Sequence, residues 1–122
     1  LDGVTKGAPA LLRAEQIQKK VARVGFEWET VAGALDKVQE EIQELKEAPA
    51  EEQLGEFGDI LFSLALVGKY MELSAEDALQ QTNDKFIRRF TRMEQLADRP
   101  LTELSLTEQD ALWNQSKQEE QS

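Results

Sequence analysis

Apolar residues recur at alternating spacings of three and four along most of this chain, and this period constrains its fold more than any other feature. In the clearest stretch the apolar positions are Val31, Leu35, Val38, Ile42 and Leu45. Good helix formers make up much of the composition, and extended runs of β-branched residues are absent. The sequence therefore predicts an all-α fold.

Breaks in this period divide the chain into four main helices and a short fifth one. We expect the main helices over residues 9–24, 29–47, 51–70 and 74–97, and the short one after Thr107. Gly25, Pro49 and Pro100 stand where helices are expected to end. Phe26 and Trp28, in the first connection, are candidate core anchors. Four helices joined by short loops predict a four-helix-bundle-like domain with a short extra C-terminal helix.

The length of 122 residues suits one domain. We expect a linker or tail at residues 1–8, a helical domain at 9–117 and a disordered polar tail at 118–122. The stretch 60–67 is apolar nearly all round, which is more surface than one small bundle covers. We therefore predict a homo-oligomer, at least a dimer, with this stretch in the subunit interface.

Charge and composition exclude several classes of function. The net charge is −10, whereas a general nucleic-acid binder carries a basic face, so we expect no nucleic-acid partner. No apolar stretch is long enough to span a membrane and no signal peptide is visible, so we expect a cytoplasmic protein without a membrane partner. The chain has no cysteine and no histidine, so a metal site has to use oxygen ligands, which favours Mg²⁺, Mn²⁺ or Ca²⁺.

Two acidic pairs are the strongest candidates for such a site. Glu41 and Glu44 lie three residues apart in one predicted helix, and Glu56 and Asp59 have the same spacing in the next. That spacing places both members of a pair on one helix face, and four converging carboxylates are tolerable only around a cation. The first pair alone also fits a solvated acidic face. Asp59, however, directly precedes the most apolar stretch, and a buried Asp needs a partner, so we favour a metal site.

A basic cluster on the fourth predicted helix has two interpretations. Lys85, Arg88, Arg89 and Arg92 form the densest group of cations in this acidic chain. They either clamp phosphate oxygens or form a solvated face that pairs with nearby acids. Asn83 lies on the apolar stripe of the same helix, so we expect its amide to face the interior. There it would either bind a ligand or set the register of helix packing.

Two further residues have alternative roles. Lys37 is four positions before Glu41, so it either pairs with that carboxylate or reaches a phosphate on the metal. Trp113 either anchors the last helix or offers a stacking face to a base.

The order of these motifs resembles the MazG family of nucleoside triphosphate pyrophosphohydrolases. The matching segments are Glu-Glu-x-x-Glu followed by Glu-x-x-Asp on the next helix, Ala22-Arg23-Val24-Gly25-Phe26-Glu27-Trp28, Asp36-Lys37-Val38 and Thr82-Asn83-Asp84-Lys85-Phe86-Ile87-Arg88-Arg89-Phe90. The resemblance covers residues 11–117 and is closest to the C-terminal domain of two-domain bacterial members. Residues 1–13 are similar to the segment that joins their domains.

The resemblance implies that residues 9–117 form a catalytic domain, which cleaves a nucleoside triphosphate between the α and β phosphates in nucleotide-pool house-cleaning. It implies Mg²⁺, replaceable by Mn²⁺, on Glu41, Glu44, Glu56 and Asp59. It further implies phosphate contacts from Lys37, Lys85 and Arg89, and a tryptophan near the base at Trp113. The implied fold is an all-α bundle that assembles as a dimer or higher oligomer through its apolar helices. Gly55 departs from the family, where an acid is common, but the four ligand positions are intact.

Two alternatives remain open at this point. The first is a relative with a narrower substrate, such as dUTP, dCTP or phosphoribosyl-ATP, which a substrate panel would separate. The second is a catalytically silent helical dimerisation module, which would show no Mg²⁺-dependent turnover.

Overall fold

The computed structural model describes residues 3–4, 7–26 and 30–121, and over these residues it is helical without strands. The helices are α1 (Ala10–Ala22), α2 (Val31–Glu47), α3 (Gln53–Tyr70), α4 (Ala75–Leu96) and α5 (Leu106–Gln121), with short 3₁₀ turns η1 (Ala50–Glu52) and η2 (Leu101–Glu103). The all-α prediction is confirmed. The chain forms two compact units, residues 1–78 and 79–122, so the boundary falls inside α4. None of the described helices is long and apolar enough to cross a membrane.

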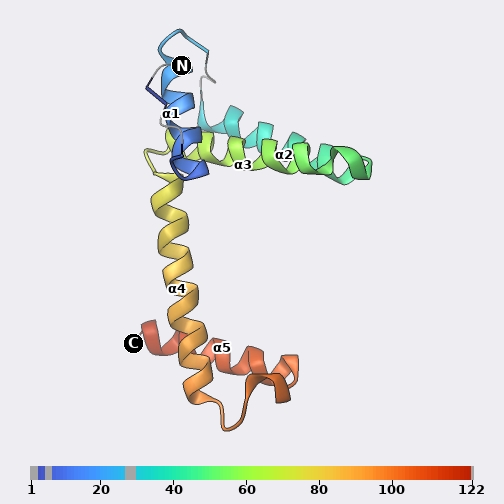
Figure 1. Cartoon of the computed structure of the whole chain (residues 1–122), viewed down its shortest axis with the longest axis vertical. Coiled ribbons are helices and arrows are strands. Elements are labelled where there is room, and N and C mark those ends of the chain that lie inside the picture. The colour runs from blue at the N-terminus through green and yellow to red at the C-terminus, as the bar shows by residue number, and fades with distance from the viewer. Residues whose placement is uncertain (1–2, 5–6, 27–29, 122) are drawn as a thin grey trace. The chain divides into compact units, whose positions relative to one another are not determined.

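In the first unit, α2 and α3 form an antiparallel hairpin, and α1 packs against α3 (Figure 1). The start of α2 is capped because the Thr30 hydroxyl accepts a hydrogen bond from the backbone N–H of Gly33 at 3.0 Å. Helix α2 ends before Pro49, which restricts Ala48 to an extended backbone. The turn η1 then leads directly into α3, so the hairpin connection is short.

The core of this unit uses small side chains. Ala34, Val38 and Val67 form a buried cluster against which Tyr70 packs. Ala34 and Ala65 are each only 1% exposed. Short side chains at the contact allow two helices to approach closely, because interaxial distance depends on the residues between them. Close approach of α2 and α3 also brings their charged residues near one another.

A polar link holds α1 to the start of α4 within the same unit. The Glu15 carboxylate accepts hydrogen bonds from the Ser74 hydroxyl and from the backbone N–H of Glu76, each at 3.1 Å. Ser74 itself caps α4 by accepting a hydrogen bond from the N–H of Asp77 at 3.2 Å. One carboxylate on α1 therefore orients the first turn of α4.

In the second unit, α5 is longer than predicted. Residues 118–121, which were expected to be disordered, form its last turn, so that expectation is wrong for them; Ser122 lies outside the described residues. The reason is charge complementarity with α4. Glu119 pairs with Arg92 at 2.6 Å, and Glu120 pairs with two neighbouring arginines of α4. A tail that looks polar in sequence is thus held by partners in another helix.

Two expectations about interior residues also need correction. Phe26 is 77% exposed, because it follows the turn that ends α1, and is not a core anchor; Trp28 lies outside the described residues. Asn83 is exposed within its own unit, so its amide does not face an interior there. The aromatic contact between α4 and α5 is made one turn later, at Phe86, so Asn83 precedes that contact.

Helices α1 and α3 end in the same type of turn with different residues at the left-handed position. After α1 this residue is Gly25, with φ of 86°, which confirms the predicted helix end; after α3 it is Glu72, with φ of 60°. In both turns the N–H of the following residue donates to the carbonyl five positions earlier. A left-handed backbone costs about 1–2 kcal/mol in a residue with a Cβ, so Glu72 is a strained choice.

Replacing Glu72 with glycine should raise the free energy of unfolding by about 1 kcal/mol, because glycine adopts positive φ without a Cβ clash. Thermal or urea unfolding followed by circular dichroism measures this change. Glu72→Gln, which removes the charge and keeps the Cβ, should leave stability unchanged. Gly25→Ala should lower stability, since a Cβ there meets no atom within 4 Å and only the backbone is strained. A Glu72→Gly protein that is no more stable than wild type would contradict this account.

Candidate active site

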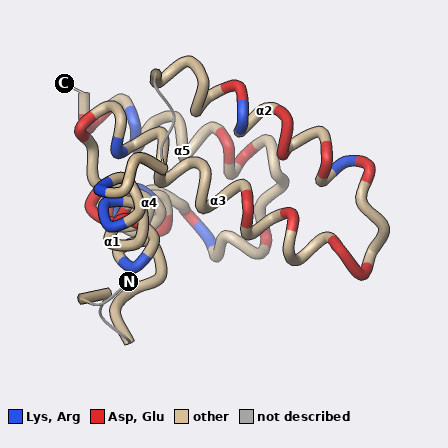
Figure 2. Tube along the Cα trace, turned by 90° about the horizontal axis from the view of Figure 1, so that it is seen from above, with Lys and Arg blue, Asp and Glu red and all other residues tan. Residues whose placement is uncertain are grey.

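The hairpin brings the two acidic pairs together. Helices α2 and α3 lie side by side and both carry acidic residues along their length (Figure 2). In an antiparallel hairpin, residues equally distant from the turn meet. Glu44 and Glu56 each lie six positions from residue 50, and Glu41 and Asp59 each lie nine positions from it. The short connection at Pro49 therefore sets the register that places carboxylate opposite carboxylate.

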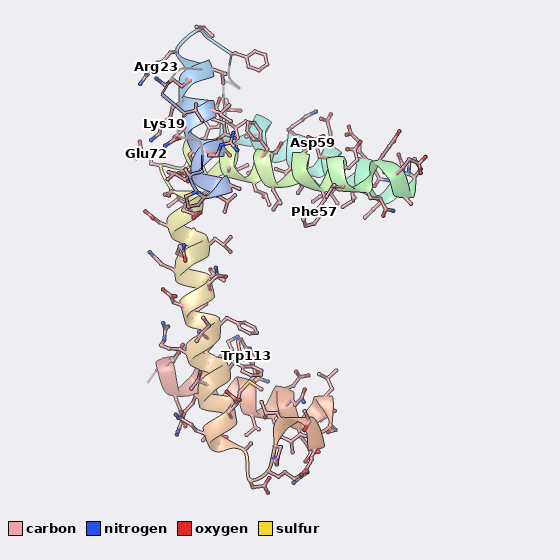
Figure 3. All side chains as sticks on the ribbon, viewed as in Figure 1. Lys19, Arg23, Phe57, Asp59, Glu72 and Trp113 are labelled. Atoms are coloured by element: carbon pink, nitrogen blue, oxygen red, sulfur yellow. The ribbon has the colours of Figure 1, made fainter. Side chains whose placement is uncertain are left out.

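Three of these carboxylates line one cavity of about 520 Å³ in the first unit: Glu41, Glu44 and Asp59. Asp59 leaves α3 on the side opposite to Phe57 (Figure 3). Glu41 is only 4% exposed and accepts a hydrogen bond from the Ser63 hydroxyl. A buried carboxylate is costly without such a partner, so Ser63 both stabilises and orients Glu41.

The fourth carboxylate, Glu56, lies beside this group in a repulsive environment. Burial raises the pKa of the Glu56 carboxyl, and the neighbouring negative charges of Glu44 and Asp59 raise it further. Its Oε2 atom is buried and accepts no hydrogen bond. Like charges and an unpaired buried oxygen both favour binding of a proton or a cation.

The chemistry of these four side chains suits a divalent cation. Among the described residues, however, no group of three acidic side chains lies close enough together to hold a metal ion as the structure stands. All four are carboxylates, the hard oxygen ligands that Mg²⁺ prefers. The unpaired Oε2 of Glu56 is an acceptor that a cation would satisfy. The carboxylates approach from two facing helices, and without a cation their mutual repulsion opposes closer convergence.

Two lysines line the same cavity. Lys37 was predicted from sequence; its ammonium lies 3.8 Å from Glu40 rather than pairing with Glu41, and its side chain faces the cavity. Lys69 was missed, because it lies ten positions after Asp59, which turns it about 80° around the helix, so sequence spacing did not place the two residues on one face. Its ammonium also lies 5.5 Å from the ring centre of Tyr70.

Most of the remaining lining is apolar, with Gln18 and Ser63 as its polar members. Val21 and Phe26 contribute from α1 and the turn after it, and Phe62 and Leu66 contribute from α3. Along α3 the lining changes from Asp59 to Leu66 over roughly 10 Å of helix. Convergent polar groups beside an apolar wall are typical of small-molecule sites, and the volume lies within their usual range.

The other predicted substrate contacts belong to the second unit. The Arg89 side chain is 14% exposed, pairs with Glu120 at 2.7 Å and lies 5.9 Å from the ring centre of Trp113. The hydrogen bond from Arg89 lowers the pKa of Glu120. Trp113 also contacts Phe86, with ring centres 5.1 Å apart, so it anchors α5 on α4. Lys85 is exposed within this unit, like Asn83.

Comparison with known proteins identifies relatives of greater length. The chain is 38% identical over 113 residues to the nucleoside triphosphate pyrophosphohydrolase/pyrophosphatase MazG of Thermotoga maritima, covering 89% of this chain and 44% of that protein. It is 39% identical over 132 aligned residues to the nucleoside triphosphate pyrophosphohydrolase of Escherichia coli K12, covering 98% of this chain and 49% of that protein. A 46% identical match over 78 residues relates it to the uncharacterized protein YabN of Bacillus subtilis, covering 61% of this chain and 16% of that protein. No family model matches the chain.

The chain thus spans a little under half the length of the two pyrophosphohydrolases that it matches. It corresponds to one domain of these longer proteins. The match extends over nearly the whole chain and includes the hairpin that carries the acidic pairs. The chain therefore belongs to the MazG family, as one MazG-like domain.

Proposed function

We propose that this chain is the catalytic domain of a Mg²⁺-dependent nucleoside triphosphate pyrophosphohydrolase. The observation that carries the proposal is the cavity between α1, α2 and α3, where three carboxylates and two lysines meet an apolar wall. Its volume suits a nucleotide, and two relatives are described as nucleoside triphosphate pyrophosphohydrolases. The products would be a nucleoside monophosphate and pyrophosphate.

Glu41, Glu44, Glu56 and Asp59 would hold the cation, Mg²⁺ or Mn²⁺, which when bound polarises phosphoryl oxygens and offsets their charge. Ser63 keeps Glu41 oriented through its hydrogen bond. Lys37 and Lys69 place positive charge in the same cavity, where a polyphosphate would otherwise meet only carboxylates.

The chain contains no histidine and no cysteine, and carboxylates are the anionic groups that line the cavity, so we propose a carboxylate as the acceptor of the proton from the attacking water. Glu44 lines the cavity, whereas Glu40 pairs with Lys37, so we assign this role to Glu44. The water oxygen forms a bond to the α-phosphorus and its proton passes to Glu44. The bond from the α-phosphorus to the bridging oxygen breaks, and pyrophosphate leaves.

Glu56→Gln should abolish Mg²⁺-dependent turnover and raise the melting temperature of the protein in EDTA. The amide keeps the shape of the side chain but removes one of several like charges around a buried oxygen. Addition of Mg²⁺ should stabilise wild type more than the variant, because the ion binds the folded wild type more tightly.

The control is Glu51→Gln, which makes the same change of charge at an exposed position in η1. It should alter neither turnover nor the response to Mg²⁺. Equal stabilisation of wild type and Glu56→Gln by Mg²⁺ would argue against the metal site. Absence of any Mg²⁺-dependent turnover in wild type would favour the silent helical module.

We further propose that Lys85, Asn83, Arg89 and Trp113 contact the nucleotide. In the structure, Glu120 holds the Arg89 guanidinium, and a substrate phosphate would replace one anion by another. Arg89→Ala should weaken binding of a non-hydrolysable triphosphate by about ten- to a hundredfold, the effect of one charge-assisted contact, and weaken a nucleoside far less.

Arg88→Ala is a matched control, since Arg88 pairs with the same Glu120 but its side chain is 62% exposed. It should leave triphosphate affinity within about twofold of wild type. Equal losses in the two variants would mean that both arginines act only through the packing of α4 on α5.

We also propose that α3 forms a subunit interface. Four exposed apolar side chains follow one face of this helix at spacings of three and four: Leu54, Phe57, Leu61 and Leu64. Two of them belong to the predicted stretch 60–67, in which Ile60, Ala65 and Val67 are buried within the unit, whereas Phe62 is exposed and lines the cavity. Phe57 lies opposite to Asp59, so this face leaves the cavity accessible (Figure 3).

Sedimentation at micromolar concentration should show at least a dimer, and Leu61→Glu should dissociate it without loss of helix content. A charge in an apolar interface is left without water or a partner. Val24→Glu, at a residue that is 82% exposed in the turn after α1, should keep the oligomer intact. A monomeric wild type would contradict the proposed interface.

A further inference from the structure

Gln18 on α1 is buried in an unusual state for a polar residue. Only 2% of the residue is exposed, although it lines the cavity. Its Nε2 donates a hydrogen bond to the backbone carbonyl of Phe62 at 2.9 Å. Its Oε1 is buried and accepts no hydrogen bond. Buried polar atoms nearly always have partners, so an unpaired acceptor in a cavity wall points to a missing donor.

The orientation of this amide is determined by its partner. A carbonyl oxygen only accepts hydrogen bonds, so the nitrogen of Gln18 has to face Phe62. Rotating the amide by 180° would place two oxygens against each other and lose the bond. The backbone of α3 therefore fixes Oε1 as the unpaired atom, and a donor held in the cavity that Gln18 lines would pair with it.

Because Oε1 of Gln18 is a hydrogen-bond acceptor, the phosphates of a nucleotide are excluded as its partner. Phosphate oxygens are acceptors that carry negative charge, so they cannot satisfy Oε1. Only the N–H groups of the base and the hydroxyls of the sugar are donors. The apolar neighbours Val21, Phe26, Phe62 and Leu66 line the same cavity. Aromatic and aliphatic side chains suit a planar base better than a hydrated sugar.

We infer that Gln18 binds the nucleobase, with its Oε1 accepting a hydrogen bond from an N–H on the base edge. This inference rests on the proposed function in that the cavity receives a nucleotide. Oε1 does not select one natural base, because adenine, guanine, cytosine, uracil and thymine each carry an N–H group on the Watson–Crick edge. It selects against bases that lack this group, since Oε1 then stays buried and unpaired.

The test compares nucleosides that differ by one donor, with binding measured by NMR titration in EDTA. Adenosine is paired with purine riboside and cytidine with 2-pyrimidinone riboside, each partner lacking the exocyclic amino group. In at least one pair, wild type should bind the nucleoside with the amino group about tenfold more tightly than the nucleoside without it. This is the effect expected when a buried acceptor loses a hydrogen bond. Gln18→Met should bring the two affinities of that pair within about twofold.

Controls separate this role from structural effects. Gln39→Met, at an exposed glutamine of α2, should keep the wild-type preference. The affinity ratio of adenosine to 2′-deoxyadenosine should be the same in wild type and Gln18→Met, whereas a change in this ratio alone would assign the contact to the sugar and overturn the inference. Circular dichroism and melting curves verify that Gln18→Met folds.

The comparison within wild type does not depend on any variant. If neither matched pair differs in affinity for wild type, the inference is wrong even though triphosphates are hydrolysed. If the preference is present but no triphosphate is hydrolysed with Mg²⁺, the proposed function fails and the base contact stands. A uniform loss of affinity for all nucleosides in Gln18→Met would assign Gln18 a purely structural role.

Discussion

Helices α2 and α3 have to pack closely to bury Ala34 and Val67, and the same packing forces carboxylates together. The antiparallel register set at Pro49 places Glu44 near Glu56. The apolar cluster lies on the same hairpin as the acidic pairs, so its burial holds the helices together against their repulsion. A cation bound between the two helices would offset this repulsion.

The two compact units are held by different forces. In the first unit apolar burial is supplemented by polar links from α1, through Gln18 to α3 and through Glu15 to α4. In the second unit α5 is held on α4 by the contact of Trp113 with Phe86 and by exposed ion pairs. Exposed ion pairs are screened by salt and individually weak. Lys85 and Arg89, two of the residues proposed to contact the nucleotide, thus belong to the unit whose helix contact is more sensitive to salt.

Helix positions were predictable because their signals are local. The three-and-four spacing, Pro49 and Gly25 gave ends within about two residues of those observed for α1 to α3. The errors concern residues whose state depends on distant partners. Residues 118–121 are helical because arginines of α4 meet their carboxylates. Phe26 is apolar and Asn83 lies on an apolar stripe of the sequence, so both were expected to face an interior. Both are exposed, because no neighbouring helix covers them within their own units.

The residues of the candidate site were likewise predictable only where the signal is local. The acidic pairs follow from helix geometry, since a spacing of three places two carboxylates on one face whatever the tertiary context. The cavity wall does not, because Lys69 and Gln18 reach it only through the packing of α1 on α3. The bond from Gln18 to Phe62 joins residues 44 positions apart. Sequence spacing therefore determined which residues share a helix face, whereas only tertiary packing decided which faces meet and which buried acceptor remains without a partner.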